Sequence, residues 1–144
     1  MILEAKQNEY KTLTELWENS IRATHTFLKE ADINFFRPKI LNEYLYVVKL
    51  YVYKDEFENI LGFIGIDENK VEMLFIEPKY FKKGIGKKLM EFTIKTHKID
   101  EVDVNEQNQN AINFYIHLGF EVVNRSETDS LGKPFPILHL RLKK

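Results

Sequence analysis

The stretch Met73–Met90 constrains the fold more than any other part of the chain, because a strand, a turn and a helix follow one another within it. Its apolar beginning stops at Pro78, whose missing N–H group cannot serve a central strand, so we expect a strand to end there. A basic turn and two glycines come next, and Leu89, Met90 and Phe92 then recur at helical spacing. The glycines therefore stand where a helix begins.

Such a helix start favours the binding of an anion. The first N–H groups of a helix have no partner inside it, and the helix dipole adds positive potential at that end. Glycines let a phosphate group come close to these N–H groups, and neighbouring lysines add charge. The stretch predicted to bind phosphate comprises Lys82, Lys83, Gly84, Ile85, Gly86, Lys87 and Lys88.

The spacing excludes two common phosphate-binding loops. A Walker A loop requires Ser or Thr directly after Gly-Lys, and Lys88 stands in that place. A Rossmann fingerprint requires a glycine or alanine where this chain has Leu89. The spacing thus disfavours a general nucleotide-phosphate binder.

Composition narrows the class of protein. The 144 residues suit one domain, predicted to span residues 1–144, with 44% hydrophobic and 30% charged residues. A net charge of -1 gives no electrostatic case for a nucleic-acid partner, and no apolar run reaches the roughly 20 residues that cross a bilayer. Residues 1–6 lack the basic and apolar regions of a signal peptide, so we expect a cytoplasmic protein.

The reactive side chains add two expectations. The chain has no cysteine, which excludes disulfide bonds and a cysteinyl acyl intermediate, so any acyl transfer would proceed by direct attack on a bound donor. Its histidines have no metal-ligand spacing, so we expect no metal site. They are His25, His97, His117 and His139.

Hydrophobic periodicity and turn residues predict a mixed α/β chain. Three strands joined by short polar turns predict an antiparallel meander, and the strand–helix–strand unit after it predicts a parallel pair. We expect strands at 2–6, 44–54, 60–66, 71–76, 102–104, 120–128 and 137–142, and helices near 8–24, 31–42, 84–97 and 108–118.

The segment Asn108–Phe120 reads Asn-x-x-Ala-x-x-Phe-Tyr-x-x-x-Gly-Phe, which resembles a mark of the GCN5-related N-acetyltransferase (GNAT) family. Gly84-Ile85-Gly86 resembles the pyrophosphate loop of the same family, at the right distance before that segment. Trp17–Leu28, Val104–Asn108 and Gly132–Leu138 further resemble the YjaB-type bacterial subgroup. The resemblance covers nearly the whole chain.

The resemblance implies an α/β GNAT fold, with a mixed, mostly antiparallel seven-stranded sheet that splays between its fourth and fifth strands and is flanked by about four helices. It also implies acetyl-CoA as the donor, with the pantetheine arm filling the gap like an extra strand. The product would be an N-acetylated amine of a small molecule or peptide. Dimers are common among relatives, so we expect a monomer or a homodimer.

Transferred residue by residue, the resemblance implies three sets of donor contacts. Backbone groups of the fourth strand would bind pantetheine and the acetyl carbonyl, and amides from Lys82 to Lys87 would cradle the pyrophosphate. From the last helix, the first of the residues named below would contact the pantetheine, and the two aromatic ones would flank the thioester end. Phe81 departs from the family, which usually has Arg or Gln there, so Lys82, Lys83 or Lys88 would supply the charge. The strand and helix residues are Leu74, Phe75, Ile76, Asn108, Phe114 and Tyr115.

Attack of an amine on a thioester requires a neutral amine, a polarised carbonyl and a proton for the departing thiolate. Tyr115 is the natural proton donor, with a phenol pKa of about 10 against about 8.5 for a thiol, although core packing is the usual role of such a tyrosine. Glu72 is a candidate base next to Met73, yet strand alternation equally allows it to face solvent. A chain of waters would serve instead.

The acceptor side is expected around the first helix connection. His25 could bind the acceptor or take its proton, and the alternative is that it closes a helix end through a backbone hydrogen bond. Trp17 and Phe27 are expected beside it, and Phe135 could line an acceptor pocket, with core packing as the alternative.

The sequence therefore predicts an acetyl-CoA-dependent N-acetyltransferase that transfers the acetyl group directly to a primary amine. The alternative is a CoA-binding regulatory or interaction module that kept the fold and lost transfer, for which Phe81 is the only support. Lysine side chains, protein N-termini, polyamines and amino sugars all fit as acceptors, because the acidic residues are too dispersed to mark one of them.

Overall fold

The computed structural model describes residues 1–143 and is built on one seven-stranded sheet with the strand order β1-β2-β3-β4-β5-β7-β6. The strands are β1 (Ile2–Glu4), β2 (Lys49–Lys54), β3 (Ile60–Asp67), β4 (Lys70–Ile76), β5 (Glu101–Asn105), β6 (Phe120–Ser126) and β7 (Ile137–Leu142). The α-helices are α1 (Tyr10–Thr24), α2 (Glu30–Lys39), α3 (Leu45–Val47), α4 (Ile85–His97) and α5 (Gln109–His117). This confirms the predicted mixed α/β sheet.

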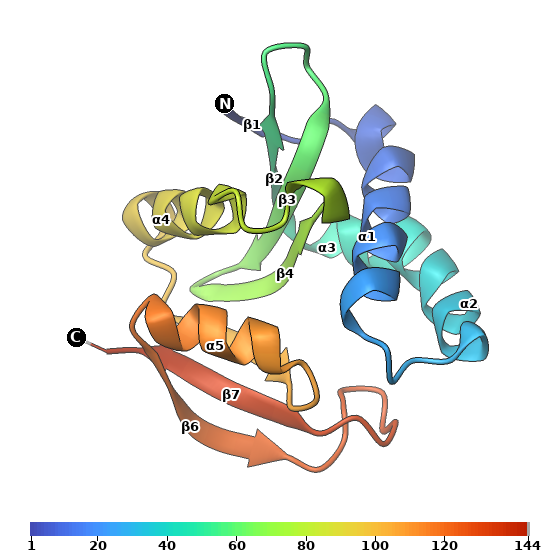
Figure 1. Cartoon of the computed structure of the whole chain (residues 1–144), viewed down its shortest axis with the longest axis vertical. Helices are drawn as coiled ribbons and strands as arrows, with labels where there is room; N and C mark the ends of the chain where they lie inside the picture. The colour runs from blue at the N-terminus through green and yellow to red at the C-terminus, as the bar shows by residue number, and fades with distance from the viewer. Residues whose placement is uncertain (144) are drawn as a thin grey trace.

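Helices cover both faces of the sheet, with α1 and α2 on one side and α4 on the other (Figure 1). The central strand β3 is apolar along most of its length and is buried on both faces. Because side chains alternate along a strand, Phe63 packs into the core beneath α1 with Leu16, and Ile64 packs into the opposite core with Leu89 of α4.

Strands β4 and β5 run parallel, as predicted, but only residues 70–71 of β4 pair with β5. The rest of β4 pairs with β3 alone, so its other backbone edge faces a gap. Figure 1 shows the result: β4 belongs to the upper part of the molecule, whereas α5, β7 and β6 form the lower part. The predicted splay between the fourth and fifth strands is confirmed.

A β-bulge in β4 lies where the two strands part. Gly65 of β3 pairs with Met73, and the next residue, Ile66, pairs with Val71, so Glu72 is an extra residue on β4. A bulge bends its strand and increases the local twist, which explains why β4 leaves β5 directly after it.

The strand predicted at residues 44–54 is wrong at its beginning, because β2 starts only at Lys49. Residues 44–47 belong instead to a helical stretch that runs from Glu30 through a π-helix (Ile40–Tyr44) to Val47. Leu45 is fully buried in the core beneath α1. Burial of its side chain in a helix thus overrides the strand preference of the neighbouring Tyr and Val residues.

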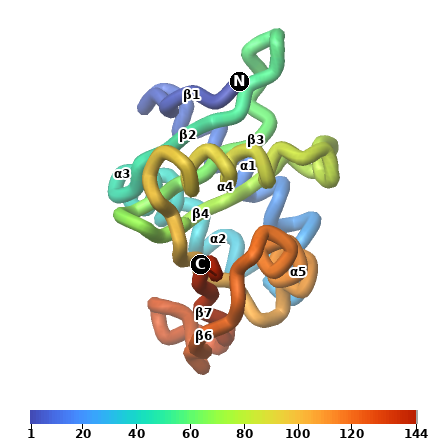
Figure 2. The backbone as a smooth tube through the Cα atoms, turned by 90° about the vertical axis from the view of Figure 1, so that its left-hand side faces the viewer, coloured from blue at the N-terminus to red at the C-terminus, as the bar shows by residue number. Residues whose placement is uncertain are grey.

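Helices α4 and α5 both face the viewer in Figure 2, α4 against the first strands of the sheet and α5 near β6 and β7. They therefore flank the gap between β4 and β5 from the same side. Within residues 1–143, no helix combines the length and apolar character needed to cross a bilayer.

Candidate active site

The splay opens a cleft of about 890 Å³. Its walls come from four parts of the chain: the end of α1, the free edge of β4, the turn leading into α4, and α5. The predicted site residues that line it are His25, Leu74, Phe75, Ile76, Lys82, Gly84, Ile85, Gly86, Lys87, Asn108 and Phe114. Segments far apart in the sequence therefore meet in one cavity.

The free edge of β4 forms one wall of this cleft. Leu74, Phe75 and Ile76 pair with β3 on one side, and the pairing with β5 has already ended on the other. An unpaired strand edge presents N–H and C=O groups that a second extended segment can bind. This wall can therefore hold a strand-like ligand.

The turn before α4 supplies N–H donors. Lys82 and Gly84 both have left-handed backbone conformations, with φ of 62° and 83°. Gly84 is the N-cap of α4, and no side chain caps the helix. Within residues 1–143, the N–H groups of Ile85, Gly86 and Lys87 consequently have no backbone partner. Successive free N–H groups at a helix start form a site for an anion.

The four predicted lysines do not contribute equally. Lys82 and Lys87 line the cleft and bring positive charge to it. Lys83 and Lys88 are not among the residues that line the cleft. The ammonium group of Lys88 lies 5.6 Å from the centre of the Tyr53 ring, and Lys83 is exposed to solvent. The charge at the helix start therefore comes mainly from Lys82 and Lys87.

Helix α5 is held close to the start of α4. A Cβ atom built on Gly86 would lie 3.3 Å from Cζ of Phe114, so a side chain at this position would crowd the cleft. Asn108 caps α5 as predicted, because its Oδ1 accepts a hydrogen bond from the N–H of Ala111 at 3.2 Å.

Tyr115 lies on α5 with its ring turned into the core. The ring packs edge-on against Phe114 and Phe120, with centroids 5.0 and 5.8 Å away, and the residue is 6% exposed. It does not line the cleft, although Phe114 beside it does. Burial raises the pKa of the phenol far above its ordinary value, so the hydroxyl group stays protonated.

Glu72 is the bulged residue of β4, is exposed, and does not line the cleft. Partial desolvation raises the pKa of its carboxyl group, Asp103 and Asp67 raise it further, and Lys70 acts in the opposite direction. Its charged neighbours thus lie at the paired end of β4 and β5.

His25 closes the end of α1 with its backbone and also lines the cleft with its side chain, so both alternatives considered from the sequence are compatible with its position. Its backbone N–H donates to the carbonyl of Ile21 at 2.8 Å and closes α1, and its side chain lines the cleft. Burial lowers the pKa of the imidazole to about 4. The ring is therefore uncharged at neutral pH.

The lowered pKa of His25 predicts a loss of stability in mild acid. The unfolded chain takes up this proton near the ordinary pKa of about 6.5, whereas the native chain takes it up near 4. Between these values the unfolded state binds more protons, so the free energy of unfolding falls as the pH drops, by up to about 3 kcal/mol. In urea unfolding, His25→Gln should lose less stability than the original chain between about pH 7 and pH 5. Equal losses would contradict this.

The aromatic residues predicted for the acceptor side lie in two places. His25, Phe27 and Phe135 form a row, with ring centroids 5.3 Å apart for the first pair and 6.0 Å for the second. This row joins the connection after α1 to the loop between β6 and β7. Trp17 is 4% exposed and packs in the core beneath α1.

Several residues that line the cleft were not predicted as site residues from the sequence. Asn110, Asn113 and His117 share one face of α5 with Phe114, so their helical spacing was a usable signal. His117 was expected at the surface; it is exposed and also borders the cleft. The other additions are Ser20, Ala23, Thr24, Tyr80, Phe81, Ala111 and Leu118.

Comparison with known proteins supports the GNAT family, which the sequence resembles. Residues 47–122 match the model of the acetyltransferase (GNAT) domain. The chain is 34% identical over 139 residues to the peptidyl-lysine N-acetyltransferase YjaB of Salmonella typhimurium, a match that covers 96% of this chain and 95% of that protein.

Solved structures of N-acetyltransferases have the same fold as this chain. The solution structure of apo-form YjaB from Escherichia coli matches with a TM-score of 0.90 and 32% identity, over 98% of this chain and 95% of that one. The PaiA N-acetyltransferase of Thermoplasma acidophilum, solved in complex with coenzyme A, matches with a TM-score of 0.72 and 26% identity over 96% of each chain. The chain therefore belongs to the GNAT family of N-acetyltransferases, for which acetyl-CoA is the donor, as its sequence predicted.

Proposed function

We propose that this protein transfers the acetyl group of acetyl-CoA to the side-chain amine of a lysine in a peptide or protein. The observation that carries the proposal is the cleft, which combines a free strand edge with free N–H groups at the start of α4. The choice of acceptor is supported by the similar Salmonella typhimurium protein, which is named a peptidyl-lysine N-acetyltransferase. Small-molecule amines are the alternative acceptors.

In this proposal the donor is bound by backbone groups. The N–H groups of Ile85, Gly86 and Lys87 would hold the diphosphate, and Lys82 would add charge. Pantetheine is an extended chain with amide groups, so the edge of residues 74–76 would bind it as an added strand. Asn108 would face it from the opposite wall.

Transfer would proceed by direct attack, since no cysteine is available to carry the acetyl group. Free N–H groups of β4 would polarise the acetyl carbonyl. Tyr115 would protonate the departing thiolate: its ring packs in the core beside Phe114 of the cleft wall, but its hydroxyl group stays protonated and, within residues 1–143, has no hydrogen-bond partner of its own. Glu72 or a bound water would take the first proton from the acceptor ammonium group.

The proposal is tested with one donor and a panel of amines. Acetyl-CoA at about 100 times its Kd should stabilise the protein by about 2.7 kcal/mol in thermal unfolding, and ATP should stabilise it less. Thiol release should occur with a lysine-containing peptide and stop when the same lysine is already acetylated.

Other outcomes would point elsewhere. Stabilisation by acetyl-CoA, with no release of the coenzyme A thiol in the presence of any amine, would favour the CoA-binding module. Release with a polyamine or an amino sugar, but not with the peptide, would overturn the choice of acceptor. Stronger stabilisation by ATP than by acetyl-CoA would overturn the choice of donor.

A further inference from the structure

The hydrogen bonds of Thr24 determine which nitrogen of His25 carries a proton. The Thr24 hydroxyl group donates to the carbonyl of Ser20 at 2.8 Å, and the same oxygen lies 2.8 Å from Nδ1 of His25. A hydroxyl group has a single proton, so Nδ1 must be the donor in the second contact. The uncharged ring therefore has its proton on Nδ1 and a lone pair on Nε2.

The lone pair on Nε2 has only a weak partner. The side-chain amide of Asn108 lies 3.5 Å from Nε2, at the limit of a hydrogen bond. The other end of that amide is fixed, because its oxygen caps α5 at Ala111. Nε2 thus sits in the cleft wall with an acceptor position that a ligand can use.

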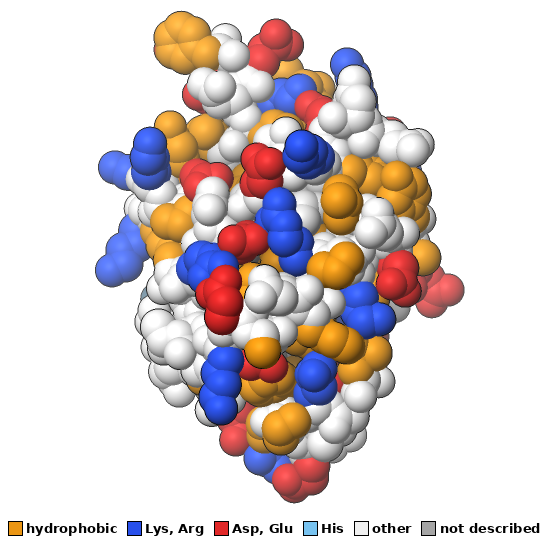
Figure 3. Space-filling view, turned by 90° about the vertical axis from the view of Figure 1, so that its right-hand side faces the viewer, with side chains coloured by type: hydrophobic (Ala, Val, Ile, Leu, Met, Phe, Trp, Pro, Cys, Tyr) orange, Lys and Arg blue, Asp and Glu red, His pale blue; other side chains and the backbone are white. Residues whose placement is uncertain are grey.

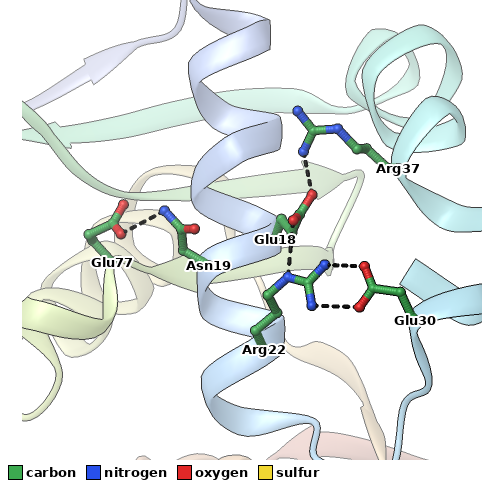
Figure 4. Close-up of polar contacts among 6 residues, drawn as sticks. All are labelled: Glu18, Asn19, Arg22, Glu30, Arg37 and Glu77. Atoms are coloured by element: carbon green, nitrogen blue, oxygen red, sulfur yellow. Dashed lines mark hydrogen bonds and ion pairs between the residues drawn. The ribbon is translucent and has the colours of Figure 1, made fainter. Parts of the chain in front are cut away.

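Ion pairs between α1 and α2 brace the connection in which His25 lies (Figure 4). Arg22 donates two hydrogen bonds to Glu30, at 2.8 and 2.7 Å, and so spans the connection between α1 and α2. Glu18 accepts from Arg22 at 3.0 Å and from Arg37 at 2.6 Å. The face of the molecule in Figure 3 carries interleaved acidic and basic side chains, with apolar atoms exposed between them.

The ring of His25 continues into an apolar wall. Phe27 packs against it, and Phe135 from the β6–β7 loop packs against Phe27. Both phenylalanines are partly exposed. Such a wall suits the unbranched alkyl chain of a lysine, whose nitrogen would then reach Nε2 of His25.

We propose that Nε2 of His25 accepts an N–H hydrogen bond from the acceptor amine, holds that nitrogen against the acetyl carbonyl, and takes its proton after attack. This inference rests on the proposed function. The amine nitrogen forms a bond to the acetyl carbon, the carbon–sulfur bond breaks, and sulfur leaves with the electron pair and receives a proton from Tyr115. The positively charged nitrogen then gives its surplus proton to Nε2, which passes it to water, and Tyr115 regains its own from solvent.

The charge state of His25 agrees with this assignment. An uncharged imidazole does not repel an incoming ammonium group, and burial keeps it uncharged in the working pH range. A free ammonium group holds its proton too tightly for such a weak base. The first proton is therefore left to Glu72 or water, and His25 receives the second one, which is far more acidic once the nitrogen has attacked.

The kinetic test compares His25→Ala with His25→Gln, using a lysine peptide and acetyl-CoA. His25→Ala should lower kcat/KM for the peptide by about 10- to 100-fold at every pH tested, while the Kd for acetyl-CoA stays within about twofold. His25→Gln should recover part of the loss, because its side-chain carbonyl reaches towards the position of Nε2. Thr24→Val should lose more activity than Thr24→Ser, which keeps the hydroxyl group.

Ring nitrogen shifts from ¹⁵N NMR of the unmodified protein provide a second readout that needs no turnover. They should show His25 protonated on Nδ1 at neutral pH. An Nε2-protonated ring, or a His25→Ala protein with full kcat/KM for the peptide, would overturn the inference. Absence of peptide turnover in the unmodified protein would instead count against the proposed function, so the two failures are distinguishable.

Discussion

Replacing Gly86 by aspartate is expected to weaken the binding of acetyl-CoA by about 100-fold or more. The side chain would meet the ring of Phe114, since even a Cβ atom would lie 3.3 Å from it. Its carboxylate would stand among the N–H groups proposed to hold the diphosphate and would repel it. A loss of two charge-assisted hydrogen bonds is enough for an effect of this size. Isothermal titration calorimetry with acetyl-CoA measures it.

Two control variants separate shape from charge. Gly86→Ala adds only the Cβ atom and should weaken binding far less than Gly86→Asp. Lys95→Gln changes the net charge by the same amount at the exposed, opposite end of α4 and should bind acetyl-CoA normally. If Gly86→Asp is folded and binds acetyl-CoA as tightly as the Lys95→Gln control, the start of α4 does not hold the diphosphate.

Tyr115→Phe is expected to lower kcat by about 100-fold, because the departing thiolate would lose its proton donor. The substitution keeps the ring that packs against Phe114 and Phe120, so the fold and the Kd for acetyl-CoA should change little. Within residues 1–143 the hydroxyl group makes no hydrogen bond to another side chain or to the backbone, which also predicts a small effect on stability. Single-turnover thiol release measures the chemical step directly.

The opposite result for Tyr115→Phe is equally informative. Unchanged kcat would leave Tyr115 as a core residue only, in keeping with its turned-in ring. A loss of acetyl-CoA affinity together with kcat would mean that the ring, and not the proton, is what matters.

Much of the fold was predictable because proline, capping residues and glycine mark the ends of its helices and strands in the sequence. Pro78 follows the end of β4, Asn108 caps α5, and Gly119 adopts the left-handed conformation after that helix, with φ of 104°. The start of β2 was not predictable in the same way. Whether Leu45 sits in a strand or a helix depends on its burial beneath α1, a tertiary contact that local preference does not contain.

The same distinction, between local sequence signals and tertiary contacts, separates the parts of the candidate site that could be predicted from those that could not. The residues around Gly84 were accessible to sequence reasoning because a phosphate site needs glycines and a helix start at fixed spacing. The contact between His25 and Asn108 was not, since these residues lie 83 positions apart and meet only where the end of α1 and the start of α5 come together at the cleft. For Glu72 the sequence left two readings open, a base beside the site or a solvent-facing residue, and alternation could not decide between them because a bulge makes Glu72 an extra residue on β4.

The most direct test of where the donor binds is a titration of the ¹⁵N-labelled protein with acetyl-CoA, followed by backbone amide NMR. The largest shifts are expected at residues 84–87, where the free N–H groups of α4 lie, and at residues 74–76 along the free edge of β4. Amides near His139, on β7, should shift little. Large shifts at His139 with none at residues 84–87 would contradict the account.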